Sequence, residues 1–164
     1  MTDPAEPAPP GEGILRVSSA TTAVVAVTSV AGAAAPGLGG VVHAGVSGLL
    51  FVMGIVTMGW AFALGVERSR AELVDTAGLF LLLGPVAPAQ IRRRLRTAVV
   101  LQTAAVVAAA AVHPFTNVAF GILAPMFGLG LMGLWGGRYG TFPHRTAARV
   151  ARTTEGDGRE CADG

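Results

Sequence analysis

Four arginines crowd into five positions near the middle of this chain, at Arg92, Arg93, Arg94 and Arg96, with long apolar stretches on both sides. Guanidinium groups at this density do not enter hydrocarbon, so this arginine cluster divides the chain into two apolar halves that meet at a membrane surface. A bilayer is the natural solvent for the rest, because 52% of the 164 residues are hydrophobic, only 13% are charged and the mean hydropathy is +0.59. At about 20 residues a span, this length accommodates about four transmembrane helices and no separate soluble domain.

The apolar stretches predict an all-α fold, a polytopic membrane protein built as a bundle of four transmembrane helices. Uncharged turn signals at 36–40 and 113–117 separate the two helices of each pair. The second stretch is longer than a bilayer requires and is expected to tilt or to emerge at one end. The expected spans are 17–35, 41–64, 95–112 and 118–137.

Polar segments flank the expected membrane domain, residues 14–140. Residues 1–13 and 141–164 are too polar to bury a core, which predicts two disordered cytosolic tails. A cleaved signal peptide is the competing interpretation of the first span, because small residues at 33–35 follow an apolar run. The acidic region before this span and Pro36 directly after the cut site favour retention.

Residues 77–89 form an apolar stretch of 13 residues that is too short to cross a bilayer comfortably, and Pro85 and Pro88 interrupt it. If it crossed, Arg68 and Arg92 would lie on opposite sides of the membrane, against the positive-inside rule. We therefore expect a short interfacial segment before the third span, with a re-entrant segment as the alternative.

The distribution of charge predicts the orientation. The turns at 36–40 and 113–117 contain no Arg, Asp or Glu, so all 12 arginines and all 10 acidic residues fall on one side of a four-span bundle. The positive-inside rule assigns that side to the cytoplasm. We expect a multi-pass protein of the cytoplasmic membrane with both termini in the cytosol.

The fourth span carries a glycine face. Gly130, Gly133 and Gly137 recur at spacings of three and four residues, so they share one side of a helix and allow another helix to approach closely. Packing within the chain is the first interpretation, and self-association or a partner subunit is the second. Pro125 lies in the same span, where its missing backbone donor predicts a kink.

Few side chains suit catalysis or ligand binding. His43 and His113 are expected at similar depth near the outer ends of their spans, where haem iron or a metal would need supporting ligands that this side lacks. Glu72 and Asp75 are spaced to share a helix face, but Arg68 nearby favours ion pairing. No ionisable residue lies in the core of an expected span, and no P-loop, zinc motif or nucleophile elbow is present. We expect no catalytic, cofactor or metal site.

Residues 114–143, PFTNVAFGILAPMFGLGLMGLWGGRYGTFP, resemble the last span of small four-span integral membrane proteins of actinobacteria. The likeness extends over about residues 14–145 and agrees with a chain whose basic residues are all arginine. That family has no assigned activity, so the resemblance implies a place in the cytoplasmic membrane and no particular chemistry.

The leading functional hypothesis is a non-enzymatic membrane component or partner-binding subunit. The arginine cluster would contact anionic lipid headgroups or an acidic partner, because a basic run beside a span meets lipid phosphates rather than nucleic acid. A purely topological role for the cluster is the alternative interpretation. The alternative function, suggested by Pro125, Gln102 and the hydroxyl-rich first span, is a small transporter or channel subunit for an uncharged or lipidic solute.

Overall fold

The computed structural model describes residues 10–144. Four helical stretches are long and apolar enough to cross a membrane, which confirms the prediction of an all-helical chain with four candidate spans. The expected tail residues 1–9 and 145–164 lie outside the described part. The elements are α1 (Glu12–Ala34), α2 (Leu38–Arg68), α3 (Thr76–Leu81), η1 (Gly84–Val86), α4 (Ala89–Val112), η2 (Asn117–Leu123) and α5 (Pro125–Tyr139).

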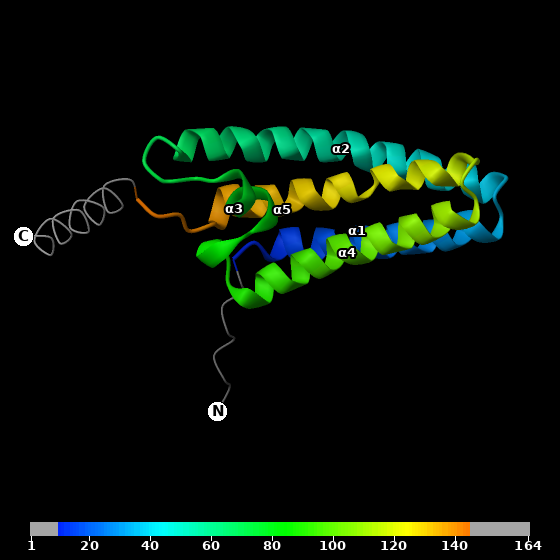
Figure 1. The fold of residues 1–164 in the computed structure, drawn as a ribbon, viewed down its shortest axis with the longest axis horizontal. Helices are drawn as coiled ribbons and strands as arrows, with labels where there is room; N and C mark the ends of the chain where they lie inside the picture. The colour runs from blue at the N-terminus through cyan, green and yellow to red at the C-terminus, as the bar shows by residue number, and fades with distance from the viewer. Residues whose placement is uncertain (1–9, 145–164) are drawn as a thin grey trace, which may run out of the picture.

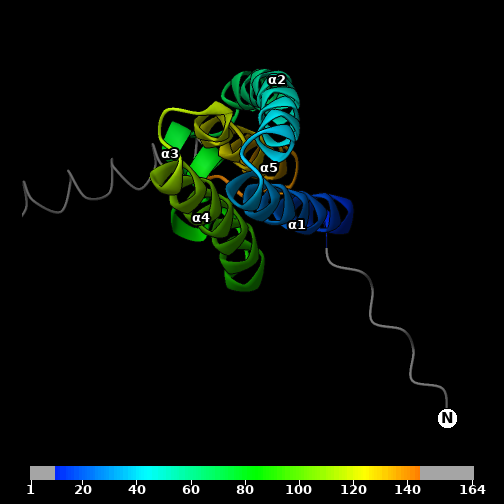
Figure 2. The same ribbon diagram turned by 90° about the vertical axis from the view of Figure 1, so that its right-hand side faces the viewer.

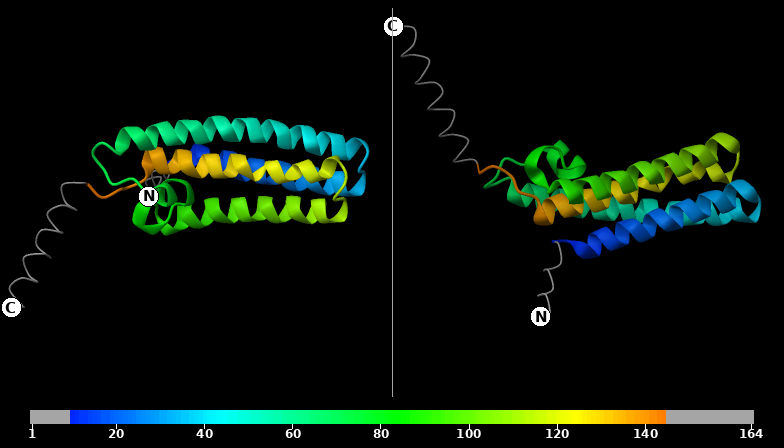
Figure 3. Two further views of the ribbon diagram at one scale, coloured as in Figure 1. Left: turned by 45° about the horizontal axis from the view of Figure 1, so that its top comes forward. Right: turned by 90° about the horizontal axis from the view of Figure 1, so that it is seen from below.

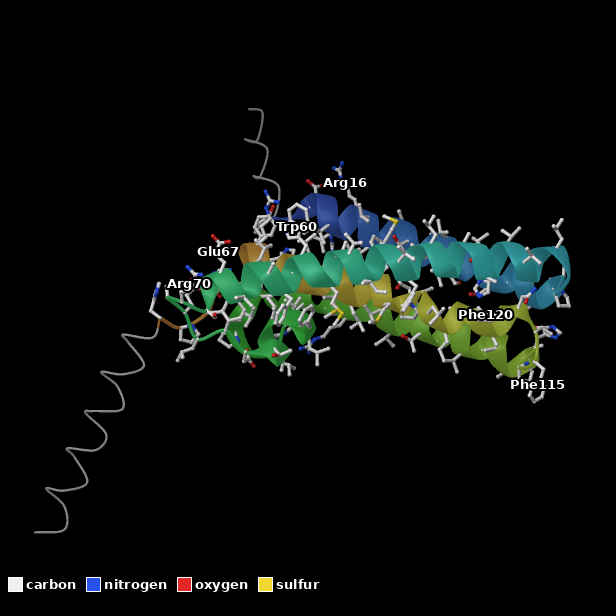
Figure 4. All side chains as sticks on the ribbon, turned by 90° about the horizontal axis from the view of Figure 1, so that it is seen from above. Arg16, Trp60, Glu67, Arg70, Phe115 and Phe120 are labelled. Carbon is white, nitrogen blue, oxygen red and sulfur yellow. The ribbon has the colours of Figure 1, made fainter. Side chains whose placement is uncertain are left out.

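The four long stretches lie side by side, and the first and last described residues lie at the same end of the bundle (Figure 1). At that end the indole Nε1 of Trp135 donates to the carbonyl of Pro10 at 3.1 Å. At the other end His113 Nε2 lies 3.0 Å from the carbonyl oxygen of Ala33. We call these the charged end and the loop end. Figure 4 shows charged side chains such as Arg16 and Arg70 at the first, and Phe115 and Phe120 at the second.

The stretch formed by η2 and α5 is the centre of the bundle, with α1, α2 and α4 around it (Figure 2). In this stretch 61% of the most apolar 18-residue segment is buried inside the bundle, against 28%, 17% and 22% of the corresponding segments of α1, α2 and α4. The outer helices accordingly direct large apolar side chains outward, as Val27 (68% exposed) and Val56 (62%) illustrate. Such exposed apolar surface is suited to lipid.

The inner face of α1 is small and polar. Ser18, Thr21, Ser29 and Gly32 are buried at helical spacing, together with the large apolar residues Leu15 and Val25. Beside this face, Thr22 and Thr28 donate to the backbone carbonyls of Ser18 and Val24 one turn earlier, whereas the buried Ser29 Oγ has no hydrogen-bond partner among the described residues. The helix therefore packs closely through small residues, as membrane helices do.

Helix α2 spans 31 residues, or about 46 Å at 1.5 Å per residue, and extends beyond the predicted 41–64 at both ends. Its last turn carries Glu67 and Arg68 at the charged end, so the excess length emerges there. Helix α4 begins six residues before the predicted start at 95, at Ala89. The arginine cluster therefore lies on the first turns of this helix, because Ile91 and Leu95 are buried (5% and 1% exposed) and anchor those turns to the bundle.

The fourth span changes its helix type at Pro125, the position where a kink was predicted. The outer part, η2, is a 3₁₀ helix of 7 residues, Ala124 keeps a helical backbone, and α5 starts at Pro125 itself. Proline has no backbone N–H to donate, and its fixed φ suits the first position of a helix. The carbonyl of Gly121 is satisfied by the N–H of Ala124 at 2.9 Å, which is the tighter 3₁₀ pattern.

Residues 76–86, which overlap the stretch expected at 77–89, fold into α3 and η1 at the charged end (Figure 3). Asp75 begins α3 by accepting from the N–H of Gly78 at 3.0 Å. Leu82 ends it with a positive φ of 50°, and its side chain is completely buried. The main apolar cluster of the described residues gathers here, around Leu79, Leu82 and Trp135.

Trp135 lies near the charged end of α5, but its ring faces the interior of the bundle rather than a membrane interface. The ring is only 1% exposed and packs into this apolar cluster, while its N–H is satisfied by Pro10. Trp60 on α2 is the exposed indole, at 62%, toward the charged end (Figure 4). Indole rings with one polar edge favour the membrane interface, so Trp60 rather than Trp135 has the position for that role.

Candidate functional site: a basic face on α4

One side of the first turns of α4 forms a basic face. Its residues are spaced by three and four positions and so share one side of the helix. They line an open depression of about 390 Å³. The lining residues are Ala89, Arg92, Arg93, Arg96 and Thr97.

Two arginines of this face are held in place by the backbone of the preceding segment. Arg92 Nη1 donates to the carbonyl of Gly84 at 2.7 Å. Arg96 donates through Nε and Nη2 to the carbonyl of Leu81, at 3.0 and 2.7 Å, and through Nη2 to that of Leu82 at 3.2 Å. These carbonyls belong to the end of α3 and the turn after it, where a helix has no further backbone N–H groups to donate to its last carbonyls. Each guanidinium has five N–H donors, so both retain donors for another acceptor.

The other two arginines of the cluster, Arg93 and Arg94, are exposed and form no ion pair with another described residue. Among residues 10–144 the ion pairs join Arg16 to Glu12 and Arg68 to Glu72, and neither includes a residue of α4. Asp75 is used as the cap of α3. The positive charge of the arginine cluster is therefore not neutralised by an ion pair in the described part of the chain.

The glycine face of the fourth span is occupied inside the bundle. A Cβ built on Gly130 would overlap Thr57 Oγ1, and one on Gly137 would lie 3.2 Å from the Cβ of Leu64, both on α2. A Cβ on Gly133 would overlap the ring of Phe80 from α3. These glycines let α2 and α3 approach α5 within the chain, so this face is not presented to a second molecule.

Buried polar side chains form a second group, toward the loop end. His43 on α2 is completely buried, its Nδ1 lies 3.2 Å from Thr28 Oγ1 on α1, and its Nε2 points at Gly121 of η2, where a Cβ would overlap it. Ser47, one turn further along the same face of α2, is 1% exposed. Neither His43 Nε2 nor Ser47 Oγ has a hydrogen-bond partner among the described residues.

Gln102 adds a polar contact in the middle of the bundle. Its side chain is completely buried and its Nε2 donates to Thr22 Oγ1 on α1 at 2.9 Å. Its Oε1 has no partner among residues 10–144, and a Cβ built on Gly128 of α5 would lie 2.8 Å from it. Gln102 thus joins α4 to α1 and faces the fourth span through a glycine.

His43 and His113 both lie near the loop end, as expected, since His43 contacts Thr28 and approaches Gly32 while His113 lies beside the carbonyl of Ala33. What differs from the expectation is exposure: His43 is enclosed between α1, α2 and η2 rather than open to an interface. Within residues 10–144 no group of three or more His, Cys, Asp or Glu side chains is arranged to hold a metal ion.

Glu72 and Asp75 do not share a helix face, because they lie in the connection between α2 and α3. Glu72 pairs with Arg68 at 2.8 Å, which confirms the predicted ion pair, and Asp75 caps α3. Arg68 also donates to the carbonyl of Gly137 at 3.2 Å and lies 5.3 Å from the ring centre of Phe142. These contacts tie the connection to the end of α5.

The sequence signal for the basic face was present in the spacing of residues 89–97, but the depression and the role of the α3 carbonyls required the fold. The burial of His43 had a weaker signal: Ser47 follows at one helical turn, and polar residues at i and i+4 in an apolar helix mark an inward face. Comparison with protein-family models, curated proteins and solved structures finds no match. The resemblance of residues 114–143 to actinobacterial membrane proteins gains no support from them.

Proposed function

We propose that this chain is a multi-pass protein of the cytoplasmic membrane whose charged end faces the cytosol. The support is the one-sided charge: within residues 10–144, every Arg, Asp and Glu lies at or beyond the charged ends of the helices, and the loop end has none. Cytoplasmic loops carry an excess of arginine, which gives the orientation. On this proposal α3 and η1 rest at the cytosolic interface, with Leu81 and Leu83, each 45% exposed, directed to lipid.

The topology is tested with reporter fusions at the N-terminus, Gly84, Pro114 and the C-terminus. A reporter active only in the cytosol is expected to function at every site except Pro114. A cytosolic signal at Pro114, or an external one at Gly84, would refute the orientation.

Within that membrane protein we assign a non-enzymatic role, exercised through the basic face of α4 on anionic lipid or an acidic partner. The observation that carries the assignment is the unneutralised charge of Arg93 and Arg94 beside two arginines already ordered by backbone carbonyls. Arginines next to a span are suited to phosphate or carboxylate groups at the cytosolic leaflet. Self-association through the glycine face loses its basis, because α2 and α3 cover that face.

Native purification tests this role. The protein extracted from its membrane in mild detergent is expected to carry anionic lipid or an acidic protein partner, released as ionic strength rises. A strictly monomeric protein without bound lipid or partner would contradict it.

Transport of an uncharged or lipidic solute is the second candidate, and the change of helix type at Pro125 in the fourth span favours it. Discontinuous helices in membranes often mark binding sites, and an ionisable residue inside the bundle is a functional candidate by default. Here His43 meets η2 at Gly121, a few residues before Pro125. Flux into proteoliposomes that is unaffected by Pro125→Ala, Gln102→Leu and His43→Phe would remove this candidate.

A further inference from the structure

We infer that the depression on α4 is a site for one molecule of anionic phospholipid, with the headgroup phosphate between Arg92, Arg93 and Arg96. The inference rests on the proposed function, since it needs this end of the bundle at a membrane surface. It goes further by naming the ligand, the three side chains that bind it and one neighbouring arginine that does not.

The site is selective within the arginine cluster. Arg92, Arg93 and Arg96 line the depression, whereas Arg94 does not. At 3.6 residues per turn, Arg92, Arg93 and Arg96 fall within about 100° of one another around the helix, whereas Arg94 projects about 160° away from both Arg92 and Arg96. The two are both exposed and carry the same charge, so they differ mainly in whether they face the depression.

Two of the three guanidinium groups are ordered before any ligand arrives. Arg96 is held by the carbonyls of Leu81 and Leu82, and Arg92 by that of Gly84. Fixed side chains lose less conformational freedom on binding, and guanidinium groups match phosphate oxygens in pairs. Arg93 is the third arginine of the site; it is not held by these backbone carbonyls, and its side chain would move to contact the phosphate.

The same face of α4 continues into the apolar part of the helix, which identifies the ligand as a lipid rather than a free anion. Val100 follows Arg96 by one turn, about 6 Å along the axis, and is 64% exposed. Val107 continues this side two turns further on and is 47% exposed. A phospholipid with its phosphate in the depression would lay its acyl chains along this stripe.

The decisive test compares Arg93→Gln with Arg94→Gln in the full-length protein. Phosphatidic acid is titrated into each protein in mild detergent, and bound lipid is counted by native mass spectrometry, with phosphatidylcholine as the reference lipid. Both residues are exposed, so thermal unfolding is expected to be the same for both variants. Arg93→Gln should weaken binding of phosphatidic acid by roughly three- to tenfold, the range for one partly screened charge-assisted contact, and Arg94→Gln by less than about twofold.

The outcomes separate the site from the general role. Equal losses in the two variants would overturn the site and leave a diffuse basic surface, consistent with the proposed function. Absence of any preference of the wild-type protein for phosphatidic acid over phosphatidylcholine would overturn both. Displacement of the lipid by inorganic phosphate at equal concentration would overturn the lipid assignment, because a free anion would then suffice.

Discussion

Gly54 of α2 lies very close to the backbone of α5, and this contact leads to a quantitative prediction. A Cβ built there would lie 2.8 Å from the carbonyl carbon of Met126 and the nitrogen of Phe127, and 3.0 Å from the Met126 oxygen. These are backbone atoms of the first turn of α5, so no side-chain rotation relieves the overlap. Ordinary contact begins at 3.4 Å, so α2 and α5 must separate.

The magnitude follows from two opposing effects. Overpacking of a closely packed interior costs about 1–3 kcal/mol, while alanine in place of glycine favours a helix by up to about 1 kcal/mol. Gly48 and Gly59, on the same helix, have no atom within 4 Å of an added Cβ and so experience only the second effect. The helix effect is the same for both alanines and cancels in the comparison, so we expect Gly54→Ala to be about 1–3 kcal/mol less stable than Gly59→Ala.

The assay is reversible unfolding of the full-length protein in mixed micelles, with rising SDS fraction and helix content followed by circular dichroism. Gly48→Ala serves as a second control. Gly54→Ala should unfold at a lower SDS fraction than the wild-type protein, and the two controls at the same or a higher fraction. A Gly54→Ala protein as stable as Gly59→Ala would refute the close contact between α2 and the start of α5.

Three further predictions concern polar contacts. Thr22→Val should destabilise the bundle by about 1–3 kcal/mol in the same SDS titration, because it leaves the buried Nε2 of Gln102 without an acceptor. Gln102→Leu removes the whole amide, both Nε2 and the unpartnered Oε1, and should stay within about 1 kcal/mol of wild type. A larger loss of stability in Gln102→Leu than in Thr22→Val would contradict this contact. Trp135→Phe removes the indole N–H that donates to the carbonyl of Pro10, just before α1. Amide exchange in the first turn of α1 should therefore accelerate, while exchange in α2 should stay unchanged and serves as the reference. Arg96→Met keeps an unbranched apolar stem but removes the donors to the end of α3, so amide exchange in α3 should rise; unchanged protection there would show that these bonds do not hold the segment.

Much of the helical framework could be predicted because it depends on local composition. An uninterrupted apolar length must pair its backbone groups within itself in lipid, so each such stretch becomes a helix whatever its neighbours are. The start of α4 was misplaced for a related reason: hydropathy ends a span at the first charge, whereas the helix continues through Arg96, Arg93 and Arg92 while Ile91 stays buried. At Pro125 the missing backbone donor is visible in the sequence and predicts a kink, but the 3₁₀ geometry of the residues before it is not visible there.

Positions of side chains within the bundle were harder to predict. His43 and Trp135 both suited an interface by chemistry, yet both are buried, because a glycine on a neighbouring element leaves space for one and the carbonyl of Pro10 satisfies the other. The glycine face illustrates the same point. Its spacing predicted close packing, but only the fold shows that α2 and α3 are the elements packed against it.

The lengths of the apolar stretches and the positions of the charges can be read from the sequence, so the number of candidate spans and the polarity of the two ends follow from it. The partner of each face depends on contacts between residues far apart in the chain, and these arise from packing. The arginine cluster shows both: its charge requires a membrane surface, while the carbonyls of Leu81 and Gly84 order Arg96 and Arg92 into one side of a depression. Arg93 and Arg94 are neighbours in sequence, but Arg93 lies on the same side of the helix as the ordered Arg96 and lines that depression, whereas Arg94 does not.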